Sequence, residues 1–132
     1  MTSHLSDVRR NHCLKHILIV EDEHDISIML RRCLEDQGYY VTYTDSRASG
    51  LAIVERVKLN LLIANVVLPD GTAFDITDLA RRKEIPFMLM TGSVEHMSQL
   101  DANGQFFLAK PFHLVDFLAE VEKLIGVAGL DD

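Results

Sequence analysis

The amino-acid sequence predicts an α/β fold in which five βα units wind around one parallel sheet. Short apolar or β-branched runs alternate five times with stretches whose apolar residues recur at helical spacing. The run Leu61–Ala64 is continuously apolar, which is typical of a central parallel strand buried on both faces. Because crossovers between parallel strands are right-handed, such a chain places helices on both faces of its sheet.

The first unit shows this pattern most clearly. Ile17–Val20 is a short buried-strand run, the acidic pair Glu21-Asp22 follows it, and Gly38 is a natural helix C-cap. The sequence therefore predicts a strand, an acidic turn and a helix. Five residues of that helix recur at helical spacing, namely Ile26, Met29, Leu30, Cys33 and Leu34.

The other four units are predicted in the same way. The expected strands are Tyr39–Tyr43, Leu61–Ala64, Phe87–Met90 and Gln105–Ala109. The expected helices follow Asp45 or Ser46, follow the Pro69-Asp70-Gly71 break, cover about Val94–Leu100, and run from Leu114 to Ile125.

Composition indicates one globular domain. The chain has 132 residues, 48% of them apolar, which is enough to bury a core without a metal or a disulfide. We assign residues 16–128 to this domain, residues 1–15 to a flexible N-terminal arm without clear periodicity, and residues 129–132 to a C-terminal tail.

Charge and cysteine content narrow the function classes. The net charge is −7, from 13 Lys and Arg against 20 Asp and Glu, so direct nucleic-acid binding is not expected. No apolar run reaches the length of a membrane span, and the N-terminus lacks the apolar region of a signal peptide. Cys13 and Cys33 lie far apart and indicate reduced thiols, so we expect a cytoplasmic protein without membrane contact.

Polar residues close four of the predicted strands. Glu21-Asp22, Asn65, Thr91 and Lys110 each follow an apolar run. In a flavodoxin-like doubly wound sandwich with strand order 2-1-3-4-5, strands one and three are neighbours at the centre of the sheet. The polar residues at these four strand ends are therefore predicted to form one pocket, although an acidic pair taken alone is more often a solvated turn.

These motifs resemble the receiver domains of bacterial two-component response regulators, the CheY-like superfamily. The resemblance covers nearly everything from His16 to Gly126. The matching stretches are I-L-I-V-E-D-E at 17–23, N-V-V-L-P-D-G at 65–71, M-T-G at 90–92 and K-P-F at 110–112.

The resemblance implies a role for each of these polar residues. Glu21 and Asp22 would bind Mg²⁺ together with position 65 and the backbone carbonyl of Val67. The residue at position 65 would take a phosphoryl group from a histidine kinase or a phosphotransfer protein. Thr91 and Lys110 would contact the phosphoryl oxygens, Phe107 would be the aromatic switch residue, and the Lys110-Pro111 peptide would be cis.

Asn65 departs from the family pattern. An acyl phosphate needs a carboxylate nucleophile, which a neutral amide of nearly the same shape cannot provide, so phosphorylation is not expected at this position. An amide carbonyl is also a weaker Mg²⁺ ligand than a carboxylate, so we expect weakened metal binding. Without a third acid competing, Lys110 can pair with Glu21 or Asp22.

Three function classes follow. The leading one is a stand-alone, phosphorylation-independent receiver, a protein-interaction module rather than an enzyme. A homodimer is compatible with this class. The second is a conventional phosphorelay receiver seen as an acceptor-blocked Asp-to-Asn variant, or one that uses another acid such as Asp70. The third is an unrelated flavodoxin-like ligand binder, which is disfavoured because no Gly-rich phosphate loop follows the first strand.

Overall fold

The computed structural model describes residues 15–129, and within them it has the predicted α/β architecture. The sheet strands lie in the spatial order β2-β1-β3-β6-β7, all parallel, which is the flavodoxin-like order 2-1-3-4-5. The predicted fold class is confirmed. These strands are β1 (His16–Val20), β2 (Tyr40–Thr44), β3 (Leu61–Asn65), β6 (Phe87–Thr91) and β7 (Phe107–Ala109).

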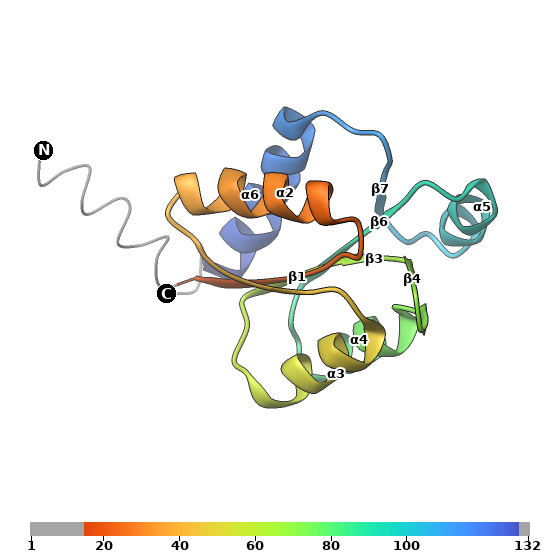
Figure 1. Ribbon diagram of the computed structural model, residues 1–132, viewed down its shortest axis with the longest axis horizontal. Helices are drawn as coiled ribbons and strands as arrows, with labels where there is room; N and C mark the ends of the chain where they lie inside the picture. The colour runs from red at the N-terminus through yellow and green to blue at the C-terminus, as the bar shows by residue number, and fades with distance from the viewer. Residues whose placement is uncertain (1–14, 130–132) are drawn as a thin grey trace, which may run out of the picture.

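Helices cover both faces of the sheet (Figure 1). One face carries α2 (His24–Asp36) and α6 (Leu114–Gly129). The other carries α3 (Arg47–Arg56), α4 (Phe74–Arg82) and α5 (Val94–Ala102). None of these helices is long and apolar enough to cross a membrane, as far as the described residues go. The expected N-terminal arm, apart from Lys15, and the expected tail, apart from Gly129, lie outside those residues.

The two halves of the core follow from the alternation of side chains along each strand. In β1, Ile17 and Ile19 pack beneath α2 and α6, whereas Leu18 and Val20 pack beneath α3, α4 and α5. All four side chains are fully buried, and each such burial stabilises the fold by about 1.5–3 kcal/mol. Because the strands are buried on both faces, their carboxyl ends are held in fixed positions. Glu21, Asn65, Thr91 and Lys110 lie at these ends.

Two local expectations differ from the structure. Helical spacing groups Met29 with Leu30 and Leu34, but Met29 is 40% exposed because the buried positions of α2 are Ser27, Leu30 and Leu34. The last strand begins at Phe107 rather than at Gln105. The Gln105 backbone N–H instead donates to the Leu100 carbonyl and completes the turn that ends α5.

A short antiparallel hairpin follows β3 and was not predicted. Its strands, β4 (Val67–Leu68) and β5 (Gly71–Thr72), have two residues each. The Pro69-Asp70-Gly71 break forms the turn, in which Gly71 has a φ of 137°, a conformation that favours glycine. The hairpin therefore folds back the segment between Asn65 and α4.

The end of α4 predicts a stabilising substitution. Glu84 has a φ of 60°, and the Ile85 backbone N–H donates to the Ala80 carbonyl, as in a helix end where glycine is preferred. A side chain in this left-handed conformation costs about 1 kcal/mol, so Glu84→Gly should raise the free energy of unfolding by up to about 1 kcal/mol. Urea unfolding would measure the change. Glu84→Ala removes the carboxylate but keeps the Cβ, so equal stability of the two variants would contradict the explanation.

Candidate functional site at the carboxyl ends of the strands

The register of the sheet brings the predicted polar residues to one edge. Val20 lies beside Ala64, Asn65 beside Met90, and Thr91 beside Ala109. Glu21 and Lys110 come one residue after the paired ends of β1 and β7. Because all four strands are parallel, these polar residues emerge at the same edge of the sheet.

Lys110 lies at the centre of the polar contacts. Its Nζ is 2.6 Å from Glu21 Oε1 and 2.9 Å from Glu23 Oε1, while Glu21 Oε2 accepts a hydrogen bond from the Glu23 backbone N–H at 3.1 Å. The Glu21 side chain is fully buried and that of Lys110 is 12% exposed. Burial raises the pKa of the Glu21 carboxyl above its ordinary value, although the Lys110 hydrogen bond opposes the shift. The pair is therefore a charge-assisted contact with little access to water.

Asn65 is held by its own loop. The residue is 8% exposed, and its Nδ2 donates to the backbone carbonyl of Val67 at 2.7 Å. The nitrogen must face that carbonyl, because two acceptor oxygens at this separation would repel each other. The amide thus fixes the start of the β4–β5 hairpin.

Thr91 and Lys110 are joined through the backbone. The Lys110 N–H donates to the Thr91 carbonyl at 2.8 Å, and the Lys110-Pro111 peptide is cis, as the family resemblance implied. Thr91 is 1% exposed, and its Oγ1 accepts a hydrogen bond from the Ser93 N–H at 3.0 Å. Ser93 caps α5 in turn, so the Thr91 hydroxyl is positioned by the start of that helix.

A cavity of about 680 Å³ opens over these groups. Its polar lining includes Asn65, Thr91 and Lys110, and its apolar lining includes Met29 and Phe112. This size and this mixture of a few polar groups with apolar walls are typical of a site for a small ligand or for side chains of a partner. The remaining lining residues are Glu23, Ile26, Val67, Gly92, Ser93 and Pro111.

Not every predicted site residue joins this cluster. Asp22 is exposed and lies outside the cavity lining. Phe107 packs, partly buried, against the half of the core beneath α3, α4 and α5. Glu23, rather than Asp22, contacts Lys110, and the sequence does not predict this contact because an acid just before a helix commonly complements the helix dipole. The E-D-E run at 21–23 is the signal that could have identified Glu23.

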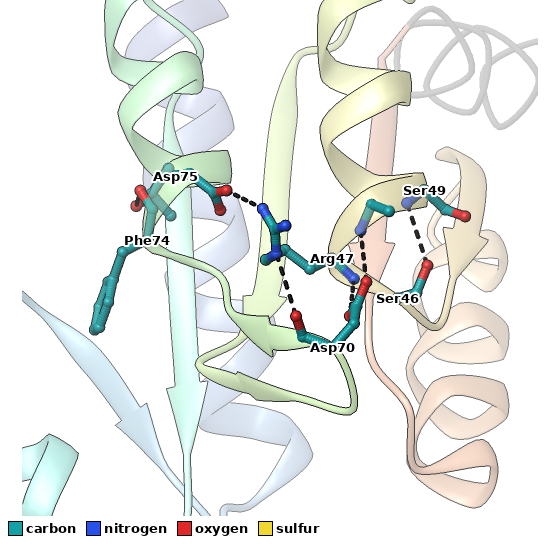
Figure 2. Close-up of polar contacts among 8 residues, drawn as sticks. Ser46, Arg47, Ser49, Asp70, Phe74 and Asp75 are labelled. Carbon is teal, nitrogen blue, oxygen red and sulfur yellow. Dashed lines mark hydrogen bonds and ion pairs between the residues drawn. The ribbon is translucent and has the colours of Figure 1, made fainter.

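Asp70 does not line the cavity; instead, its side chain caps α3 (Figure 2). Its Oδ1 accepts from the Arg47 N–H at 2.7 Å and its Oδ2 from the Ala48 N–H at 3.0 Å. The Arg47 guanidinium donates back to the Asp70 carbonyl at 3.4 Å and pairs with Asp75. The hydrogen bonds from Arg47 and Ala48 lower the pKa of the Asp70 carboxyl. The turn of the β4–β5 hairpin is thereby attached to a helix 22 to 23 residues earlier in the chain.

This attachment predicts a pH-dependent loss of stability in variants of Asp70. Asp70→Ala should lower Tm at neutral pH, and Asp70→Asn, which keeps one acceptor oxygen, should lower it less. Because the folded-state pKa lies below the ordinary value of 3.8, the advantage of the wild type is complete above that value and declines as pH falls through the folded pKa.

Thermal unfolding at pH values on both sides of 4 would measure the change. Asp101→Asn, on the exposed surface of α5, is the matched control. A Tm difference between wild type and Asp70→Asn that stays constant on acidification would rule out the proposed capping contact.

Comparison with known proteins defines the class. The response regulator receiver domain family matches residues 17–122, and the chain therefore belongs to that family. The chain is 32% identical over 123 residues to the response regulator receiver protein CpdR of Brucella abortus, a match that covers 87% of this chain and 100% of that protein. It is also similar to the non-phosphorylated receiver domain of HemR from Leptospira biflexa, with a TM-score of 0.72 and 28% identity over 84% of this chain and 94% of that one.

Other relatives are longer than the matched region. The transcriptional regulatory protein CusR of Escherichia coli is 32% identical over 114 residues, which cover 83% of this chain but 50% of CusR. The chain thus spans the whole of one curated relative and about half the length of another. Receiver domains are signalling modules that interact with histidine kinases or phosphotransfer proteins, and this is the class to which the fold and the family assign the chain.

Proposed function

We propose that this chain is a phosphorylation-independent receiver, a cytoplasmic protein-interaction module of two-component signalling in which Asn65 occupies the phosphoacceptor position. The observation that carries the proposal is the place of Asn65 at the end of β3, in one cavity with Thr91 and Lys110. A carboxamide has no anionic oxygen with which to attack a phosphoryl group, so the site lacks its nucleophile while it keeps the neighbouring groups.

Among the described residues, neither Asp70 nor Glu21 offers a substitute nucleophile. Asp70 is engaged with the N-terminus of α3 and does not line the cavity. Glu21 is buried and both of its oxygens have partners, one in Lys110 and one in the Glu23 N–H. Of the described acids around the cavity, only Glu23 has a side chain that is largely exposed and in contact with Lys110, and its role there is to hold the ammonium.

The cavity rim supports a function in protein binding. Met29 and Val67 are 40% and 45% exposed although they are apolar, and both border the polar groups. Exposed apolar side chains around a hollow of this kind are a common feature of surfaces that receive a partner. We propose a histidine kinase or a phosphotransfer protein as the partner, and an output that depends on binding alone.

A second candidate is a conventional phosphorelay receiver whose acceptor aspartate has been changed to asparagine. The observation that favours it is that Glu21, Thr91 and Lys110 keep places from which they could serve a phosphoryl group on position 65. The two candidates make the same prediction for the chain that carries Asn65. They differ in what the genome encodes at position 65.

Incubation with a small phosphodonor and Mg²⁺ tests the lack of phosphorylation. Intact-mass spectrometry should show no phosphoryl adduct on the wild-type chain, because the amide cannot form an acyl phosphate. A stable adduct that maps to the peptide containing Asn65 would defeat the proposal.

Asn65→Asp is the matched gain-of-function variant. It should acquire the adduct, because it restores the nucleophile without a change of shape. The adduct should again disappear in Asn65→Asp/Lys110→Met, in which the ammonium is absent. No adduct on folded Asn65→Asp would show that more than one residue of the acceptor site has been lost.

A further inference from the structure

The buried carboxylate of this site already has a cation. Lys110 Nζ lies 2.6 Å from Glu21 Oε1 and 2.9 Å from Glu23 Oε1, and the second Glu21 oxygen accepts a backbone hydrogen bond. Water screens these contacts little, because the side chains of Glu21 and Lys110 are 0% and 12% exposed. A divalent ion bound to the same Glu21 oxygen would lie about 4 Å from the ammonium and would be repelled by it.

Asn65 weakens a second point of attachment for a metal. Its amide presents Nδ2 to the Val67 carbonyl at 2.7 Å, so that a donor faces the carbonyl and occupies one of its lone pairs. Mg²⁺ requires oxygen ligands in an octahedral arrangement. Within residues 15–129, no group of three or more His, Cys, Asp or Glu side chains is placed to hold a metal ion.

Asp22 does not compensate for these losses. Although it follows Glu21 directly, it is exposed and lies outside the lining of the cavity. Receiver domains typically bind Mg²⁺ in their active site, and the donor set of this chain does not fit that ion.

We propose that Lys110 is the resident cation of this site, where it takes the place that Mg²⁺ has in other receiver domains. Glu21 and Glu23 hold the ammonium, and Asn65 closes the loop onto Val67, so the buried Glu21 carboxylate has a counter-charge without a metal. The inference concerns cation binding only. An unphosphorylated receiver that still bound Mg²⁺ would overturn it and leave the proposed function intact.

The wild-type chain gives the first test, with Mn²⁺ as a paramagnetic probe. Electron paramagnetic resonance should show no saturable binding up to millimolar Mn²⁺, and Tm should be equal in EDTA and in Mg²⁺, because a ligand that binds only the folded state must raise stability. Saturable Mn²⁺ binding that Mg²⁺ displaces, and that Glu21→Gln abolishes, would overturn the proposal.

Removal of the ammonium gives the second test. Lys110→Met frees the oxygens of Glu21 and Glu23 and should bind Mn²⁺ at least tenfold more tightly than the wild type. Lys110→Gln provides a second neutral variant that can still donate a hydrogen bond to Glu21, in case the first does not fold. Lys123→Met is the matched control, since it removes the same charge from an exposed position on α6.

The outcomes are distinct. A gain of Mn²⁺ affinity in a Lys110 variant that Lys123→Met does not share, and that an added Glu21→Gln removes, supports the proposal. Circular dichroism would establish that each variant is folded. Folded Lys110 variants that bind Mn²⁺ no better than the control would overturn it.

Discussion

The contact between Lys110 and Glu21 is the constraint on which the rest of the site depends. It joins residues that are 89 positions apart and places a nearly buried ammonium against a fully buried carboxylate. Such a pair contributes little net stability, because desolvation offsets the attraction, but the loss of one partner commonly costs about 3–5 kcal/mol. The pair therefore acts mainly through geometry, since the Lys110 side chain links the end of β7 to the end of β1 although β3 and β6 lie between these strands.

The amide at position 65 leaves the cavity without a third acid for Lys110 to contact. A carboxylate there would compete for the ammonium and would add a third negative charge beside Glu21 and Glu23. Two like charges about 4 Å apart repel by about 4 kcal/mol at an effective dielectric near 20, and a neutral side chain relieves that repulsion. Asn65 instead binds the Val67 carbonyl, so the ammonium and the two glutamates satisfy one another.

The fold and most of the candidate site could be predicted because both depend on strong, regular signals. Continuous apolar runs placed the strands, and the parallel topology then required Glu21, Asn65, Thr91 and Lys110 to meet. The features that could not be predicted depend on the angular position of a side chain around its helix and on contacts between residues far apart in the sequence. Met29 differs from the buried Leu30 by one position on a helix, and the choice of Glu23 over Asp22 depends on how α2 begins. The capping of α3 by Asp70 joins residues that no local pattern connects.

The loop after β3 is held from both of its sides, and this bears on how the protein signals. The Asn65 amide fixes Val67 at the start of the hairpin. Asp70 fixes the hairpin turn to α3 (Figure 2). A switch needs two arrangements that differ by only a few kcal/mol and a ligand that favours one of them. Here the internal cation and the two attachments all favour the same arrangement. Under the proposed phosphorylation-independent function, these contacts would present one arrangement of the loop to a partner protein.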